Sequence, residues 1–113
     1  MKLEFHGHDE RYVVEQSLMN LFPGELPVYE PIVPGDDSWA VISLEETEDL
    51  CRVAVSLCRG GKTAGQTYQE PLSGGDFQRE GQRRHAVGAC FFLAARAVTG
   101  MTPPWGMLTG VRP

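Results

Sequence analysis

An almost continuous apolar stretch near the end of the chain, AVGACFFLAARAV at residues 86–98, is the feature that most constrains the fold. It follows the polar stretch DFQREGQRRH, and together they predict one long helix from Asp76 to about Thr99, with Gly100 as its stop. Arg96 is the only charge in the apolar half. A helix that is apolar all round is normally buried on more than one side. We therefore expect a sheet to cover one side and something else to cover the rest.

The N-terminal part of the chain predicts a short strand followed by a helix. Apolar and polar residues alternate over residues 1–6, with Leu3 and Phe5 on one face, which is typical of a half-buried strand. From residue 9 to residue 22 the apolar residues recur instead at helical spacing, and Pro23 with the glycine after it ends that pattern.

The middle of the chain predicts further strands. Residues 39–46 are rich in β-branched and aromatic side chains and residues 50–58 alternate, so these two segments predict a hairpin. Residues 28–33 predict an edge strand, because Pro31 cannot donate to a central ladder. Residues 60–75 are polar and glycine-rich, and we interpret them as a long connection.

The order of elements, β-α-β-β-β-α, predicts an α+β fold. We expect a mainly antiparallel sheet of three or four strands with two helices packed on one face. A chain of 113 residues is one domain by length, and it buries enough surface to need neither a disulfide nor a metal. We place the α+β domain at residues 1–100 and treat residues 101–113 as a separate segment.

Charge and cysteine content narrow the functional classes. The net charge of -5 has the wrong sign for a domain that binds nucleic acid through its overall charge. The spacing of Cys51, Cys58 and Cys90 matches no zinc or iron–sulfur pattern, so we predict no metal and no cofactor in this chain. The alternation predicts that Cys51 is buried and that Cys58 is more exposed. We see no secretory leader and no membrane-spanning stretch, and expect a cytoplasmic protein.

Two short motifs are weak candidates for sites. The stretch GGKT at residues 60–63 lacks the first glycine of a phosphate-binding loop, since Ser56 stands there, so a turn is favoured. His6 and His8 stand two positions apart but no third metal ligand is identifiable, so a solvated loop is favoured. We name no catalytic residue.

Three arginines in the polar half of the long helix, Arg79, Arg83 and Arg84, are candidate anion contacts. The alternative is a solvated helix face on which Asp76 and Glu80 pair with arginines three and four residues further on. We favour this alternative.

The C-terminal stretch PPWGMLTGVRP is unusual for a chain end because it combines prolines, a tryptophan and several apolar residues. We predict that it forms a domain interface together with the apolar half of the long helix. The candidate residues of this interface are Phe92, Leu93, Trp105, Leu108 and Arg112. Two other arrangements stay open: the tail folds back over the helix, or a second copy of the chain covers the exposed surface.

This ending resembles a junction in the oxygen-independent coproporphyrinogen III oxidases and dehydrogenases, a radical-SAM family in which an N-terminal domain precedes the catalytic barrel. A P-W-G-x-L-T-G-[IV]-R-P stretch follows a long helix there. It is matched here by Pro104, Trp105, Gly106, Leu108, Thr109, Gly110, Val111, Arg112 and Pro113. The stretch DERYVVEQSLMNLFPGE at residues 9–25 also resembles the opening helix of that family.

The resemblance implies a non-catalytic accessory domain of an enzyme of haem and porphyrin biosynthesis. The CxxxCxxC motif that holds the [4Fe–4S] cluster in that family is missing from this sequence. The cluster and S-adenosylmethionine are therefore expected only in a catalytic domain that would follow residues 101–113 as the junction. The implied partners are that downstream domain and, for the truncated chain, a second copy, with no membrane and no nucleic acid.

A small RNA-binding α+β module is the alternative from another class. It would use Arg79, Arg83 and Arg84 together with the loop that carries Lys62. The acidic net charge and the absence of exposed aromatic pairs on the predicted sheet argue against it.

Overall fold

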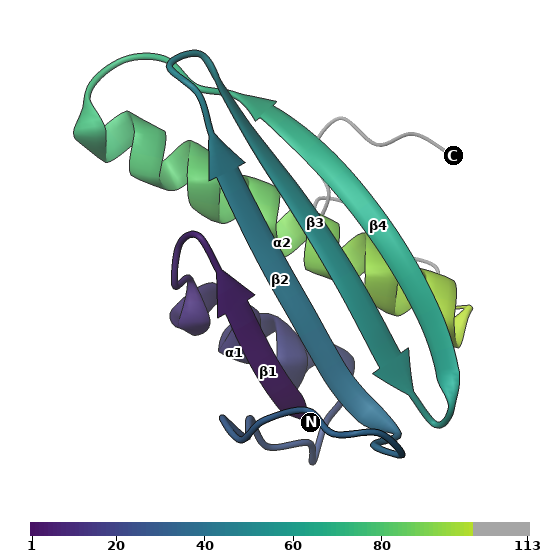
Figure 1. Ribbon diagram of the computed structural model, residues 1–113. Coiled ribbons are helices and arrows are strands. Elements are labelled where there is room, and N and C mark those ends of the chain that lie inside the picture. Colours follow the sequence, from purple (N-terminus) through teal and green to yellow (C-terminus); the bar gives the residue numbers. More distant parts are fainter. Residues whose placement is uncertain (101–113) are drawn as a thin grey trace.

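The computed structural model describes residues 1–100 of the chain. Its elements are β1 (Lys2–His6), α1 (Arg11–Leu21), β2 (Ser38–Glu46), β3 (Leu50–Arg59), β4 (Lys62–Pro71) and α2 (Asp76–Thr99). The four strands form one sheet in the order β1-β2-β3-β4, and both helices lie on the same face of it (Figure 1). The predicted α+β class with two helices is confirmed. None of the helices among residues 1–100 is both long and apolar enough to cross a membrane.

The sheet is mixed rather than purely antiparallel. β1 runs parallel to β2, with Leu3 opposite Ala40 and Phe5 opposite Ile42, whereas β2, β3 and β4 are antiparallel. Parallel neighbours need a crossover that returns the chain to the same end of the sheet, and α1 lies in that connection. The expected order β-α-β-β-β-α matches roughly, because the three strands between the helices are not all the predicted segments.

The strand β4 replaces a predicted connection, so the interpretation of residues 60–75 as a loop is wrong. Gly60 and Gly61 have φ angles of 61° and 80°. Two consecutive positive φ angles are what a two-residue hairpin turn of type I′ requires, and they let β4 fold directly back on β3. β4 is polar because it is an edge strand, and only alternate residues such as Ala64 and Tyr68 pack against the core.

The edge strand predicted at residues 28–33 is reduced to a single bridge. Val28 pairs with Lys2 of β1, and the chain then leaves the sheet without forming a strand. The amide that would continue the ladder belongs to Glu30, so the missing N–H of Pro31 is not the cause. The side chain of Tyr29 is bonded to Glu15 of α1 instead, which draws this segment toward the helix.

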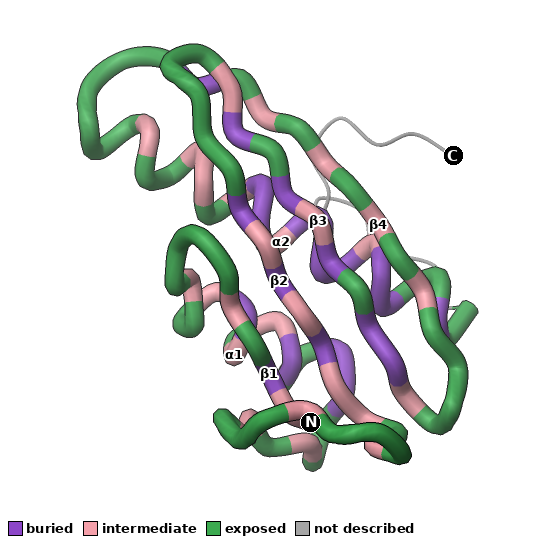
Figure 2. The backbone as a smooth tube through the Cα atoms, in the orientation of Figure 1, coloured by how far each residue is buried: buried purple, intermediate pink, exposed green. Residues whose placement is uncertain are grey.

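The hydrophobic core lies between the sheet and the helices (Figure 2). Ile42, Val53, Val55 and Leu57 project from the central strands and are at most 1% exposed, and Phe91 meets them from α2. α2 lies against β3 and β4, so the prediction that a sheet covers one side of this helix is confirmed.

The second cover of α2 is α1, which packs against it. A Cβ atom at Gly88 would lie 3.4 Å from Cγ1 of Val13, so the two helices approach closely at that point. Val14 of α1 is fully buried. Phe92 is 3% exposed and Leu93 is half-buried against the same core. These two side chains are therefore covered by other parts of the same domain. The starting assumption of the predicted interface, that nothing else in the domain covers this side of α2, is corrected.

The cysteines lie on the predicted faces of β3, but Cys58 is not exposed. Cys51 shares the core face with Val53 and is fully buried, and Cys58 is only 5% exposed. Trp39 of β2 is the direct partner of Cys58 in the ladder, so the indole stands beside the thiol on the same face. A large neighbour across the ladder buries a residue that the alternation pattern alone assigns to solvent.

Candidate functional site

The outer edge of β1 has a ladder that stops after one bridge. The amide of Leu3 donates to the carbonyl oxygen of Val28 at 2.9 Å, and the amide of Val28 donates to the carbonyl oxygen of Met1 at 2.9 Å. In an extended strand the backbone groups of alternate residues face the same edge, so the Leu3 carbonyl and the Phe5 amide also face outward. Among residues 1–100 nothing pairs with these two groups. They are the two positions that a longer strand after Val28 would have used.

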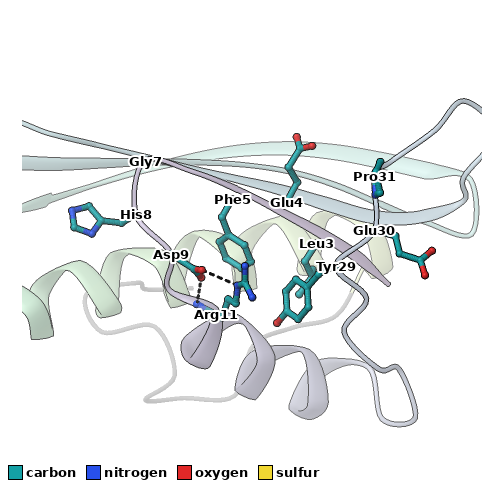
Figure 3. Close-up of a pocket in the computed structure, with 10 residues that line it drawn as sticks. All are labelled: Leu3, Glu4, Phe5, Gly7, His8, Asp9, Arg11, Tyr29, Glu30 and Pro31. Carbon is teal, nitrogen blue, oxygen red and sulfur yellow. Dashed lines mark hydrogen bonds and ion pairs between the residues drawn. The ribbon is translucent and has the colours of Figure 1, made fainter.

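A pocket of about 400 Å³ opens at this edge (Figure 3). Its lining comes from β1, from the beginning of α1 and from residues 29–31. In Figure 3 the ring of Phe5 points toward the helix layer, whereas the carboxylate of Glu4 points away from it on the open side of the sheet. The pocket volume lies within the range of small-ligand and peptide side-chain pockets.

The wall opposite β1 is the side chain of Tyr29, and α1 holds it in place. The Tyr29 hydroxyl donates a hydrogen bond to Glu15. The guanidinium carbon of Arg11 lies 4.4 Å from the centre of the Tyr29 ring, which is a cation–π contact. Burial, and after it the bond to Glu15, raises the pKa of Tyr29 to about 12. Because Tyr29 is tied to α1, residues 29–31 do not pair with β1, and within residues 1–100 this part of the edge has no backbone partner.

The charges around the pocket are mostly negative. Arg11 is the only lysine or arginine among the described residues that line it, and Arg11 Nε lies 2.8 Å from a carboxylate oxygen of Asp9. Asp9 also accepts the backbone amide of Arg11 at 3.2 Å and so positions the first turn of α1. Glu4 and Glu30 also line the pocket, and the partner of Glu4 among residues 1–100 is the exposed His6 at 2.9 Å. An incoming segment that carries positive side chains therefore suits this edge.

The predicted anion contacts all have partners inside the chain. Arg83 forms an ion pair with Glu46 of β2, which lowers the pKa of that carboxyl through their hydrogen bond. Arg84 lies 2.8 Å from Glu80 and 3.7 Å from Glu10. The pairing with Glu80 is the helix-face arrangement that the sequence analysis favours. An anion site at these arginines stays a prediction.

The third arginine and the lysine of the RNA-binding alternative lie at different ends of the sheet. Arg79 donates to the carbonyl oxygens of Gly74 at 3.1 Å and Glu48 at 2.8 Å, so it joins the beginning of α2 to the β2–β3 turn. Lys62 follows the β3–β4 turn at the other end of the hairpin. The length of β3 separates them, which is about 30 Å for ten residues.

Of the predicted interface residues, only Phe92 and Leu93 fall within the described part of the chain. Trp105, Leu108 and Arg112 lie outside the described residues, as does the whole motif that carries the family resemblance. The interface itself stays a prediction.

The titratable groups of the core offer no activated nucleophile. Burial raises the pKa of Cys51 to about 11 and that of Cys90 to about 12, so both thiols stay protonated at neutral pH. Cys90 Sγ lies 3.3 Å from the carbonyl oxygen of Gln66, to which it donates. His6 and His8 are exposed and belong to no cluster of three ligands within residues 1–100.

Comparisons with known proteins leave the family of this chain open. No family model matches it, and no curated protein matches it. A solved structure that is similar is that of a "putative lipoprotein" from Caulobacter crescentus CB15. Its TM-score is 0.40 at 10% sequence identity, with 85% of this chain and 83% of that chain covered.

The predicted membership of the radical-SAM coproporphyrinogen family is therefore wrong. No family model matches the chain, that of the coproporphyrinogen family included. The prediction rested mainly on the stretch at residues 104–113, which lies outside the described residues, and more weakly on residues 9–25. The expected cluster, S-adenosylmethionine and downstream catalytic domain rested on the same resemblance and have no other support.

Proposed function

We propose that this chain is a non-catalytic interaction module that binds an extended peptide segment by adding it as a strand to the outer edge of β1. The observation that carries the proposal is the interrupted ladder. The Leu3 carbonyl and the Phe5 amide face an open pocket and have no partner within the described residues. Strand addition supplies affinity through such main-chain groups, and side-chain pockets supply selectivity.

The bridge at Val28 defines the register of the incoming strand. A parallel segment that continues from the position of Val28 places one residue beside Glu4. The amide of that residue donates to the Leu3 carbonyl, and its carbonyl accepts from the Phe5 amide. Its side chain lies on the open face with Glu4, and the residues before and after it face the ring of Phe5.

The preferred peptide follows from this alternation. The position beside Glu4 favours lysine or arginine, because its side chain would lie on the open face with the Glu4 carboxylate, and Glu30 lies at the same edge. Arg11 does not counter these carboxylates, since it lies on α1 and pairs with Asp9. Positions that face Phe5 favour β-branched apolar residues, which suit an extended, half-buried strand. We therefore propose an alternating basic and apolar segment as the ligand class.

The test uses the peptide acetyl-Val-Lys-Val-Lys-Val-amide and two N-methylated versions of it. Methylation of the lysine amides removes the donors that face β1, and methylation of the central and last valine amides alters only the outer side. We expect the parent and the valine-methylated peptides to shift the NMR signal of the Phe5 amide. The lysine-methylated peptide should bind at least about tenfold more weakly, or about 1.4 kcal/mol. Equal binding of all three peptides, or no binding of the parent, would overturn the proposal.

Two substitutions at one position separate the backbone from the side chain. Phe5→Pro removes the outward amide but spares the β1–β2 ladder, since that amide does not face β2. Phe5→Ala removes the same ring and keeps the amide. Strand addition requires Phe5→Pro to bind the peptide clearly more weakly than Phe5→Ala, with both variants folded by circular dichroism.

The RNA-binding alternative has less support, because Arg83 and Arg84 have carboxylate partners and Lys62 lies at the far end of the sheet. Salt-dependent binding to single- and double-stranded RNA would favour it over the peptide module.

A further inference from the structure

The other edge of the sheet, β4, is long and unprotected. β4 has ten residues, and among residues 1–100 no segment pairs with its outer side. Edge strands are normally guarded by charges, prolines or bulges along their length. Here Lys62 and Pro71 stand only at the two ends, and Thr63 to Gln69 contain no charged residue and no proline. An edge of this kind is a template for pairing with another strand.

The hairpin geometry identifies which backbone groups face outward. A two-residue turn at Gly60 and Gly61 makes Arg59 and Lys62 a hydrogen-bonded pair. The same alternation of bonded and unbonded residues continues beyond the end of the strand, where the amide of Leu72 donates to the carbonyl oxygen of Asp49 at 2.9 Å. Even-numbered residues therefore bond to β3. The amides and carbonyls that face outward belong to Thr63, Gly65, Thr67 and Gln69.

The strand is complementary to itself when it is turned around Gln66. In an antiparallel pair centred there, Lys62 of each copy lies opposite Glu70 of the other, and Ala64 lies opposite Tyr68. Lys62 is exposed and has no ion pair in the part of the chain that the structure describes. A shift of two residues in either direction loses both charge pairs. Charge complementarity thus selects one register.

We propose that two copies of this chain associate through β4, antiparallel and with a two-fold axis at Gln66, into one continuous sheet. The outward groups of Gly65 and Thr67 then bond to those of Thr67 and Gly65 in the second copy. Thr63 and Gln69 bond to each other in the same way. A two-fold axis perpendicular to an edge strand closes the assembly, because it leaves no β4 edge free for a third copy. The surface lies at the opposite edge of the sheet from the peptide site, and it does not depend on that site (Figure 1).

The register of the two β4 strands is tested by reversing the charges of Lys62 and Glu70, singly and together. We compare the full chain with Lys62→Glu, Glu70→Lys and the double variant by sedimentation equilibrium. The wild type should dimerise with rising concentration, and Lys62→Glu should raise the dimer dissociation constant at least about tenfold because it opposes like charges twice. The double variant exchanges the charges and should return the constant to near the wild-type value. Glu70 also pairs with His85 at 2.8 Å, so Glu70→Lys and the double variant both lose this contact, whereas Lys62→Glu does not. Circular dichroism therefore checks that the double variant is folded before its dissociation constant is compared.

A proline at the edge tests the strand pairing itself. Thr67→Pro removes an outward amide and leaves the bonds to β3 in place, whereas Thr67→Ala keeps that amide. We expect Thr67→Pro to be monomeric and Thr67→Ala to dimerise like the wild type, with both folded by circular dichroism. A wild type that stays monomeric at every concentration, or a dimer that survives Thr67→Pro unchanged, overturns the proposal. If Lys62→Glu weakens the dimer and the double variant does not restore it, the proposed register is wrong.

Discussion

The carbonyl oxygen of Leu44 lies 2.0 Å from the position that a Cβ atom on residue 7 would occupy, so only glycine fits where β1 ends against β2. Gly7 also has a φ of 93°, which L-residues rarely adopt. Gly24 provides a matched control, because its φ is 92° and no atom lies within 4 Å of its Cβ position.

We expect Gly7→Ala to destabilise the fold more than Gly24→Ala does. Both changes bear the cost of a positive φ, about 1–3 kcal/mol. Gly7→Ala adds the displacement of the Leu44 carbonyl, a further ~1–3 kcal/mol of the kind seen on overpacking. Urea unfolding of the two variants measures the difference. Equal free energies of unfolding would show that β1 does not approach β2 as described.

The burial of Cys58 behind Trp39 predicts a selective change in thiol reactivity. In the wild type all three cysteines should react slowly with a thiol reagent, because all three are buried. Trp39→Ala should speed the labelling of Cys58 and leave Cys51 and Cys90 slow. Mass spectrometry of the labelled peptides gives the rate for each cysteine. Faster labelling of Cys51 would mean that the two faces of β3 are exchanged.

The ion pair between Arg83 and Glu46 predicts an acid-dependent contribution to stability. The hydrogen bond from Arg83 lowers the pKa of Glu46 from its ordinary value of 4.5. A lowered pKa in the folded state gives stability that is present above pH 4.5 and is lost as the pH falls through the folded value. Glu46→Gln should therefore lower the free energy of unfolding by about 1 kcal/mol at pH 7. The difference from the wild type should vanish in acid. A pH-independent difference would contradict this account.

The contact between Tyr29 and Glu15 predicts a shifted tyrosine titration. The pKa of Tyr29 is raised to about 12, first by burial and then by the hydrogen bond to Glu15. In Glu15→Gln it should fall toward 10 without reaching it, because burial remains. A raised pKa in the folded state also means that this contribution to stability is lost as the pH rises from 10 toward 12. Ultraviolet titration measures the change, with Tyr29→Phe identifying the signal. An unchanged titration in Glu15→Gln would show that α1 does not hold the pocket wall.

The burial of Phe92 predicts a loss of stability rather than a loss of association. Phe92→Ala should lower the free energy of unfolding by about 3–5 kcal/mol, as is usual for a buried phenylalanine. Leu93→Ala should cost less, because that side chain is only half-buried. Denaturant unfolding compares the two. A Phe92→Ala variant of near wild-type stability would show that this side of α2 is not packed within the domain.

Elements with strong local periodicity could be predicted from the sequence. The alternation in β3, the aromatic and β-branched content of β2 and the helical spacing around Val14 depend only on neighbours along the chain. The strand β4 was missed because a polar edge strand has weak alternation. Its signal was the Gly60–Gly61 pair, which indicates a hairpin turn when it follows a strand.

The candidate site could not be predicted, because its parts lie far apart in the sequence. Phe5, Arg11 and Tyr29 come from a strand, a helix and a connection, and no local pattern marks them as neighbours. The unpaired amide of Phe5 is a backbone group, and every residue of the chain except proline has one. Only the position of Val28, and the departure of the chain after it, leaves this amide without a partner.

The sequence by itself therefore determined the α+β class, the hairpin of β2 and β3 and the long helix, since hydrophobic periodicity is a property of consecutive residues. The tertiary structure alone decided that β1 runs parallel to β2, that α1 covers α2, and that both sheet edges stay largely unpaired within residues 1–100. These outcomes depend on which distant segments meet. The free energy of such contacts comes from pairs of residues that lie far apart in the sequence, so no local pattern reveals them.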